Sequence, residues 1–100
     1  MRFDYVIVGA GSAGCALANR LSEDGRYTVA LIEAGPRDTS PWIHITVGYF
    51  RTMGNPKMDW CYETQEDAGI ANRSIPWPRG RVLGGSSSIN GLLYVRGQAQ

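Results

Sequence analysis

Six consecutive residues near the N-terminus have the types and spacing of a site for an adenine dinucleotide. The run Gly9-Ala10-Gly11-Ser12-Ala13-Gly14 follows an apolar stretch at 5–8. Gly9 and Gly11 allow a tight turn that brings bare backbone N–H groups against a pyrophosphate, and Gly14 allows the next helix to pack closely on the strand. Glu33 lies 19 positions after Gly14 (33 − 14). Its carboxylate is placed to accept hydrogen bonds from the ribose hydroxyls of the adenosine.

The elements that must position this loop form a βαβ unit. Residues 3–8 are almost continuously apolar and β-branched, which predicts a buried parallel strand. Residues 12–24 carry apolar side chains at three- and four-residue spacing, which predicts a helix that Gly25 ends in a left-handed cap. Residues 28–33 predict a second strand, parallel to the first because a helix makes the crossover. The fold class is therefore α/β, with the N-terminal βαβ portion of a Rossmann-like domain.

The sequence after this unit is less regular, and residues 37–57 have no sustained period of either kind. Residues 37–57 predict a long irregular segment with one short helical turn at 43–50. Residues 60–64 predict a short strand, and the prolines in 72–79 predict extended chain. Most of the large aromatic residues are expected in the core and in contacts between domains; they are Trp42, Tyr49, Trp60, Tyr62, Trp77 and Tyr94.

Length, charge and cysteine content limit the class of protein. One hundred residues, 43% of them hydrophobic, amount to one globular domain at most. A net charge of +1 gives no broad field to attract nucleic acid or an anionic membrane. Cys15 and Cys61 fit neither a disulfide framework nor a zinc pattern, so we expect buried free thiols and no metal site.

No apolar run is long enough for a transmembrane helix, and the predicted strand at residue 3 leaves no room for a secretion signal. These features predict a cytoplasmic location, and they leave open a peripheral association with a membrane and the oligomeric state.

A second glycine-rich element lies at residues 78–91. Gly84 and Gly85 are followed by three serines, which places small side chains and hydroxyl acceptors where a helix could begin with outward N–H groups. Gly91 inside that helix would allow a flat ligand to approach the backbone. Two interpretations fit this pattern: a second backbone cradle for the same cofactor, or a plain junction between a loop and a helix.

The run from Arg79 to Gly97 resembles the first signature of the glucose-methanol-choline (GMC) oxidoreductases. Residues 4–14, the strand end Glu33-Ala34-Gly35 and residues 59–64 are similar to the same family, and most of all to its choline-dehydrogenase-like members. The resemblance implies an FAD-binding domain, with the pyrophosphate at Gly11 to Gly14, the ribose at Glu33 and the flavin at Val82 to Gly85 and Asn90 to Leu93. The residues then expected to bind FAD are Gly9, Gly11, Ser12, Ala13, Gly14, Glu33, Ala34, Val82, Gly84, Gly85, Ser86, Asn90, Gly91, Leu92 and Leu93.

Two positions refine what the resemblance implies. Some members attach FAD covalently through a histidine at the position of Ile89, and isoleucine cannot form that bond, so non-covalent FAD is expected. The alcohol proton is removed in the family by a histidine near the C-terminal end, whereas the only histidine here, His44, matches no catalytic position.

We therefore expect no catalytic residue and no substrate domain in this chain. Residues 1–100 are expected to be the N-terminal part of the FAD-binding domain of a longer flavin-dependent alcohol dehydrogenase. A small alcohol would be the substrate of the full-length enzyme only, and the chain alone would be inactive.

Three other functions are consistent with parts of the sequence. An NAD-dependent dehydrogenase fragment would share the first βαβ unit, but it has no use for the second glycine-rich element. The run Ala10 to Gly14 is one residue away from the nucleophile elbow of serine hydrolases, and a triad would have to use His44. A stand-alone nucleotide-binding or interaction module without chemistry remains open.

Overall fold

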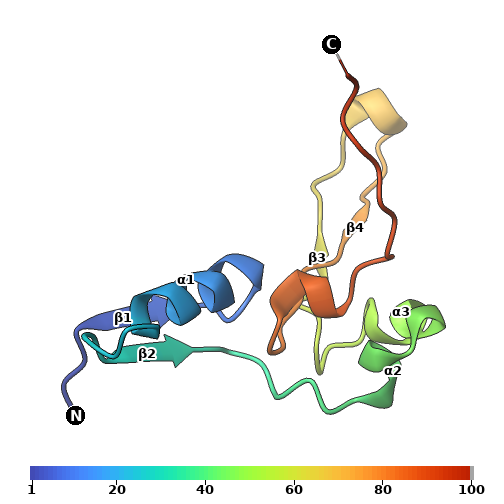
Figure 1. The fold of residues 1–100 in the computed structure, drawn as a ribbon. Coiled ribbons are helices and arrows are strands. Elements are labelled where there is room, and N and C mark those ends of the chain that lie inside the picture. The colour runs from blue at the N-terminus through green and yellow to red at the C-terminus, as the bar shows by residue number, and fades with distance from the viewer. Residues whose placement is uncertain (100) are drawn as a thin grey trace.

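A computed structural model describes residues 1–99, and its N-terminal part is the predicted βαβ unit (Figure 1). Strand β1 (Tyr5–Val8) leads into helix α1 (Ser12–Ser22), and strand β2 (Val29–Ile32) returns parallel to β1, with Tyr5 opposite Val29. Gly25 has a φ of +70°, the left-handed conformation expected after the helix. The prediction for this unit is confirmed, with each element one to two residues shorter at its ends.

Only one side of the two-stranded sheet is covered. Ile7 points toward α1, where a Cβ on Gly14 would lie 3.4 Å from its Cγ2 atom, and it is 9% exposed. Val6 and Val8, on the opposite face, are 58% and 84% exposed. The prediction of a strand buried on both faces is therefore wrong for residues 1–99, because no second layer packs on that face.

The irregular segment contains two short helices, not one. Helix α2 (Pro41–His44) begins with a proline, whose fixed φ suits a first helical position, and helix α3 (Tyr49–Thr52) follows a 3₁₀ turn, η1 (Thr46–Gly48). A Cβ at Gly48 would overlap the backbone of Trp42, so this glycine lets α2 and η1 pack together.

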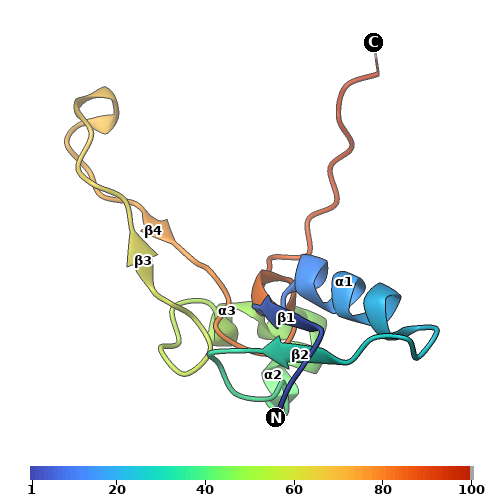
Figure 2. The same cartoon turned by 90° about the vertical axis from the view of Figure 1, so that its left-hand side faces the viewer.

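A hairpin projects from the body of the molecule (Figure 2). Strands β3 (Tyr62–Glu63) and β4 (Pro76–Trp77) pair antiparallel, and a 3₁₀ turn, η2 (Ala68–Ile70), lies near the tip. The predicted strand and the predicted extended segment are thus confirmed, and the structure adds that they pair, although only two residues of each form the ladder.

The base of the hairpin is fastened by a buried carboxylate. Asp59 is 2% exposed and accepts hydrogen bonds from the backbone N–H groups of Gly54 (2.7 Å), Cys61 (3.0 Å) and Arg79 (2.9 Å). Burial raises the pKa of Asp59, but the backbone N–H groups around it outweigh that effect, so its pKa lies below the ordinary value. Asp59 therefore holds the two ends of the hairpin together as an ionised group.

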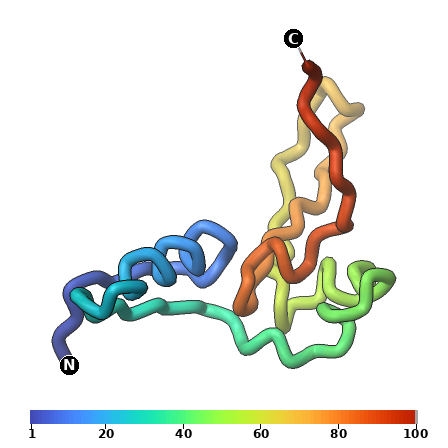
Figure 3. The backbone as a smooth tube through the Cα atoms, in the orientation of Figure 1, coloured from blue at the N-terminus to red at the C-terminus, as the bar shows by residue number. Residues whose placement is uncertain are grey.

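The second glycine-rich element forms a 3₁₀ turn, η3 (Gly85–Ser88), and no α-helix. From Ile89 to residue 99 the chain has no helix or strand, and it runs away from the body as the last part of the tube in Figure 3. The prediction that Gly91 lies inside a helix is wrong. The serine hydroxyls bond back to the chain, and the side chain of Asn90 accepts from the N–H of Leu92, which has a φ of +59°.

The buried core is small. Met58, Val82 and Ile89 pack together with the partly buried Ile43. The accessible surface is 7984 Å², against roughly 5,600 Å² for a compact protein of this mass. The radius of gyration is 16.8 Å, against about 13 Å for a compact chain of this length.

Because the core is small, the predictions of buried side chains are wrong. Each of the six large aromatic residues is at least 38% exposed in the described chain, so none lies in the core, whereas their expected contacts with another domain stay a prediction. Cys61 is exposed and Cys15 is partly buried, so neither is the fully buried thiol that was expected. In residues 1–99 no helix is long and apolar enough to cross a membrane.

Candidate dinucleotide site

The first glycine loop exposes backbone N–H groups at the start of α1. Gly9 has a φ of +98° and donates its N–H to the carbonyl of Ile32 at 2.7 Å, which turns the chain out of the sheet. A Cβ on Gly14 would overlap the carbonyl oxygen of Gly9, so the helix packs closely on the loop only because residue 14 is glycine. Gly11 precedes the helix, and no side chain caps its first turn. That turn therefore presents free donors and the positive end of the helix dipole to an anion.

Glu33 fastens this loop to the end of β2. Its Oε2 atom accepts a hydrogen bond from the N–H of Ala10 at 2.8 Å, and its Oε1 atom accepts one from the N–H of Gly35 at 2.9 Å. A carboxylate oxygen accepts more than one hydrogen bond, so both oxygens keep a free acceptor site. Glu33 can hold the loop and bind hydroxyl groups at the same time.

The two glycine-rich elements meet backbone to backbone. The N–H of Gly84 donates to the carbonyl of Ala10 at 2.8 Å, and Gly11 and Gly84 form a parallel bridge. Gly85 has a φ of +60°, and a Cβ there would lie 2.9 Å from the Cα of Gly11. Ala10 is 0% exposed and bonds to both Glu33 and Gly84. Sequence reasoning did not select Ala10, because a small residue between two glycines carries no chemical signal of its own.

The three serines stabilise the second element. Ser87 Oγ donates to the carbonyl of Gly84 at 2.6 Å, and Ser88 Oγ donates to that of Leu83 at 2.8 Å. Ser86 Oγ accepts from the N–H of Gly80 at 3.0 Å, so its own proton remains available to a ligand.

Two clefts flank the joined elements. The cleft beside β2, which we call the Glu33 cleft, has a volume of about 480 Å³. The cleft beside α1, which we call the helix cleft, has a volume of about 550 Å³. Of the residues expected to bind FAD, those that line one or both clefts are Gly9, Gly11, Ser12, Ala13, Gly14, Glu33, Ala34, Gly85 and Ser86. The Glu33 cleft also has residues that were not expected to bind FAD, among them Trp60, Tyr62, Arg79 and Gly80.

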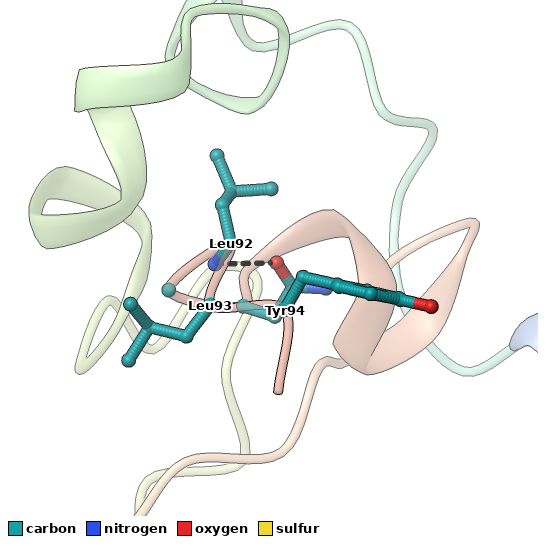
Figure 4. Close-up of a pocket in the computed structure, with 5 residues that line it drawn as sticks. Leu92, Leu93 and Tyr94 are labelled. Carbon is teal, nitrogen blue, oxygen red and sulfur yellow. Dashed lines mark hydrogen bonds between the residues drawn. The ribbon is translucent and has the colours of Figure 1, made fainter. Parts of the chain in front are cut away.

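Other expected residues lie elsewhere. Val82 is 0% exposed in the core. Residues 90–94 line a separate pocket of about 390 Å³, in which Asn90 Oδ1 accepts the N–H of Leu92 at 3.0 Å and the side chains of Leu92 and Leu93 point in different directions (Figure 4). The structure does not bring this segment into the two clefts.

His44 and Ile89 also line neither cleft. His44 is exposed on α2, where its ring nitrogen Nε2 lies within hydrogen-bond distance of the carbonyl of Asp38, and it lines neither cleft. Ile89 is 2% exposed and packs in the core against Met58 and Val82.

The chain is similar in sequence to known dehydrogenases. An alcohol dehydrogenase [acceptor] of Pseudomonas putida is 52% identical over 98 residues, which are 98% of this chain and 18% of that protein. An oxygen-dependent choline dehydrogenase of Photobacterium profundum is 55% identical over 97 residues, which are 97% of this chain and 17% of that protein. The chain thus spans less than a fifth of the length of these relatives.

Solved structures show the same likeness. The crystal structure of pyridoxine 4-oxidase from Mesorbium loti superposes with a TM-score of 0.88 at 47% identity, over 96% of this chain and 19% of that one. A formate oxidase of Aspergillus oryzae, studied for the modification of its FAD, gives a TM-score of 0.77 at 39% identity, over 88% of this chain and 16% of that one. The family model described as GMC oxidoreductase matches residues 3–100. The chain therefore belongs to the GMC oxidoreductase family, whose solved members include FAD enzymes, and it matches the N-terminal α/β portion of those enzymes.

Proposed function

We propose that this chain binds FAD non-covalently as the N-terminal part, residues 1–100, of the FAD-binding domain of a choline-dehydrogenase-like alcohol dehydrogenase. One observation carries the proposal: the glycine loop, the acid at the end of β2 and the second glycine-rich element meet at the backbone N–H and carbonyl of Ala10. The glycine loop and the acid suit the pyrophosphate and the ribose of any adenine dinucleotide, and the second glycine-rich element favours FAD over NAD.

Each part of the nucleotide has a matching group in the clefts. Ser12, Ala13 and Gly14 would bind the pyrophosphate through their backbone N–H groups in the helix cleft. The free acceptor sites of Glu33 suit the ribose hydroxyls in the Glu33 cleft. Gly85 lines the same cleft, and its lack of a Cβ lets the second glycine-rich element pack against Gly11 beside the cofactor.

The flavin part is assigned by the family motif. Val82 and Gly84 would contribute backbone only, since Val82 is buried. Asn90, Gly91, Leu92 and Leu93 would meet the flavin, since they line one pocket and the side chains of Leu92 and Leu93 are exposed. The buried position of Ile89 and its unreactive side chain support non-covalent binding.

When bound, the flavin supplies a hydride acceptor for oxidation of an alcohol at its CH–OH carbon. The residues of this chain bind and orient the cofactor. No histidine lines either cleft of the described chain, and Glu33 is engaged by two backbone N–H groups. We therefore propose that the chain binds FAD and does not turn over an alcohol without further catalytic groups.

The test is titration of the purified 100-residue chain with FAD, followed by acid precipitation of the complex and an assay with choline and an electron acceptor. We expect saturable FAD binding, complete release of flavin into the acid supernatant, and no turnover. A preference for NAD over FAD, or flavin that stays with the precipitate, would contradict the proposal.

A further inference from the structure

The Glu33 cleft has an aromatic wall that the glycine-rich elements do not explain. Trp60 and Tyr62, from the hairpin, line this cleft together with Gly9 and Glu33. Their rings are parallel, with 1° between the planes and 6.0 Å between the centroids. The two residues are 43% and 52% exposed, so much of this apolar surface is open to a ligand.

Trp60 is held in position by the base of the hairpin. Its N–H donates to the carbonyl of Arg79 at 2.9 Å, and the preceding residue is the buried Asp59. The guanidinium carbon of Arg81 lies 5.4 Å from the centroid of the indole ring. Arg81 is anchored in turn, because its Nη2 atom donates to the carbonyl of Pro56 at 2.7 Å. The ring is therefore oriented before any ligand arrives.

We infer that Trp60 packs against the adenine of the bound nucleotide, and that Arg81 is the positioning residue that holds Trp60 there. This inference rests on the proposed function, since it assumes that the ribose binds at Glu33. Adenine is joined directly to that ribose, and it is a flat heteroaromatic group that stacks well on an indole. The same cleft contains the carboxylate for the ribose and the exposed indole.

The chain contains a matched control for this indole. Trp42 is also 43% exposed, and the guanidinium carbon of Arg51 also lies 5.4 Å from its ring centroid. Trp42 belongs to α2 and lines neither the Glu33 cleft nor the helix cleft. A comparison of the two tryptophans separates contact with the nucleotide from the general effect of removing an exposed indole.

The first experiment measures the dissociation constants of ADP and FAD by calorimetry for the wild-type chain and for W60L, W60F and W42L. We expect W60L to weaken both ligands about tenfold, the loss expected from one base–aromatic contact. W60F should bind within about threefold of the wild type because it keeps an aromatic ring. W42L should bind like the wild type.

The second experiment tests Arg81 through the emission of a single tryptophan. The variant W42F/W77F keeps Trp60 alone, since the chain has three tryptophans. Its emission should shift to shorter wavelength when ADP displaces water from the ring, and R81L in that background should reduce the shift and weaken ADP binding. R81K should restore both, and R51L should change neither. The variant W60F/W77F, which keeps Trp42 alone, should show no shift.

The outcomes distinguish the two proposals. If the wild-type chain binds neither ADP nor FAD, the proposed function and this inference both fail. If it binds both ligands and W60L binds them equally well, only the inference fails. If W60L loses affinity for FAD but binds ADP as the wild type does, Trp60 contacts the flavin and not the adenine, and the inference also fails. If W60L does not fold, the affinity of W60F and the emission of Trp60 decide the question.

Discussion

Glu33 Oε2 accepts a hydrogen bond of 2.8 Å from the N–H of Ala10, across 23 positions of sequence. The carbonyl of Ala10 accepts a second hydrogen bond, from the N–H of Gly84. The backbone of one buried residue thus joins the glycine loop to Glu33 at the end of β2 and to the second glycine-rich element. The architecture of the site follows from the two hydrogen bonds of this residue more than from any ligand-facing side chain.

Replacing Glu33 with alanine should weaken both the fold and nucleotide binding. The N–H groups of Ala10 and Gly35 would lose their acceptor, which should lower the free energy of unfolding by about 1–3 kcal/mol. The ribose would lose its acceptors, so ADP should bind at least about tenfold more weakly. Urea unfolding and calorimetry measure the two effects. Glu23→Ala, which breaks an exposed ion pair with Arg20, is the control that should change neither; equal effects of both variants would contradict the role of Glu33.

Gly85→Ala should disrupt the junction between the two glycine-rich elements. The new Cβ would lie 2.9 Å from the Cα of Gly11, and the φ of +60° disfavours any side chain. We expect a loss of more than about 1 kcal/mol in the free energy of unfolding, measured by urea titration. Gly97→Ala, at a site with no atom within 4 Å of the new Cβ, should leave stability unchanged. Equal stability of the two variants would refute the close approach at Gly85.

Asp59 should make stability depend on pH at the acid end. The pKa of its carboxyl is lower in the folded protein than in the unfolded chain, so the folded state binds fewer protons. The stabilisation by Asp59 is complete above the unfolded pKa of about 3.9 and is lost as the pH falls through the folded value.

Asp59→Asn is the variant that tests this dependence. At pH 7 it should lower the free energy of unfolding by about 1–3 kcal/mol, because the side-chain amide cannot accept all three N–H groups. The difference in the free energy of unfolding between the wild type and the variant should decrease below about pH 4. Urea titrations from pH 3 to pH 7 measure this difference. A gap that stays constant over this range would show that ionisation of Asp59 is not the cause.

The two faces of β1 should respond differently when a threonine is introduced. Ile7→Thr places a hydroxyl in the buried contact with α1 and should cost about 2 kcal/mol in the free energy of unfolding. Val8→Thr, at a residue 84% exposed, should change it by less than about 0.5 kcal/mol. Urea unfolding compares the two variants. A large cost at Val8 would mean that this face is covered in solution, for example by a second copy of the chain.

The sequence predicted those parts of the fold that depend on local chemistry. The strands β1 and β2, helix α1 and the left-handed Gly25 follow from hydrophobic period and glycine position, and all were confirmed. The helix expected through Gly91 failed because serine and asparagine side chains compete for backbone groups, an effect that periodicity does not capture. Burial was predicted poorly, since it depends on which layers are present to cover a face.

The candidate site could be predicted at those residues that are themselves part of a sequence motif. Glycines and Glu33 have known backbone and acceptor roles, so their positions could be inferred from spacing. The positions of Trp60 and Ala10 in the site could not be inferred in this way, because a tryptophan in a short strand and an alanine in a loop occur in many environments. Only the hairpin geometry and the two backbone hydrogen bonds of Ala10 show their positions.

The bond between Ala10 and Gly84 spans 74 positions (84 − 10), which has a consequence for how the protein is made. During synthesis the glycine loop, helix α1 and Glu33 leave the ribosome first, and they can form their local contacts while the rest of the chain is still being added. The glycine loop can form its hydrogen bond with Gly84 only when Gly84 and Gly85 have emerged. The structure therefore predicts that the complete nucleotide site forms late in synthesis, after the second glycine-rich element has emerged.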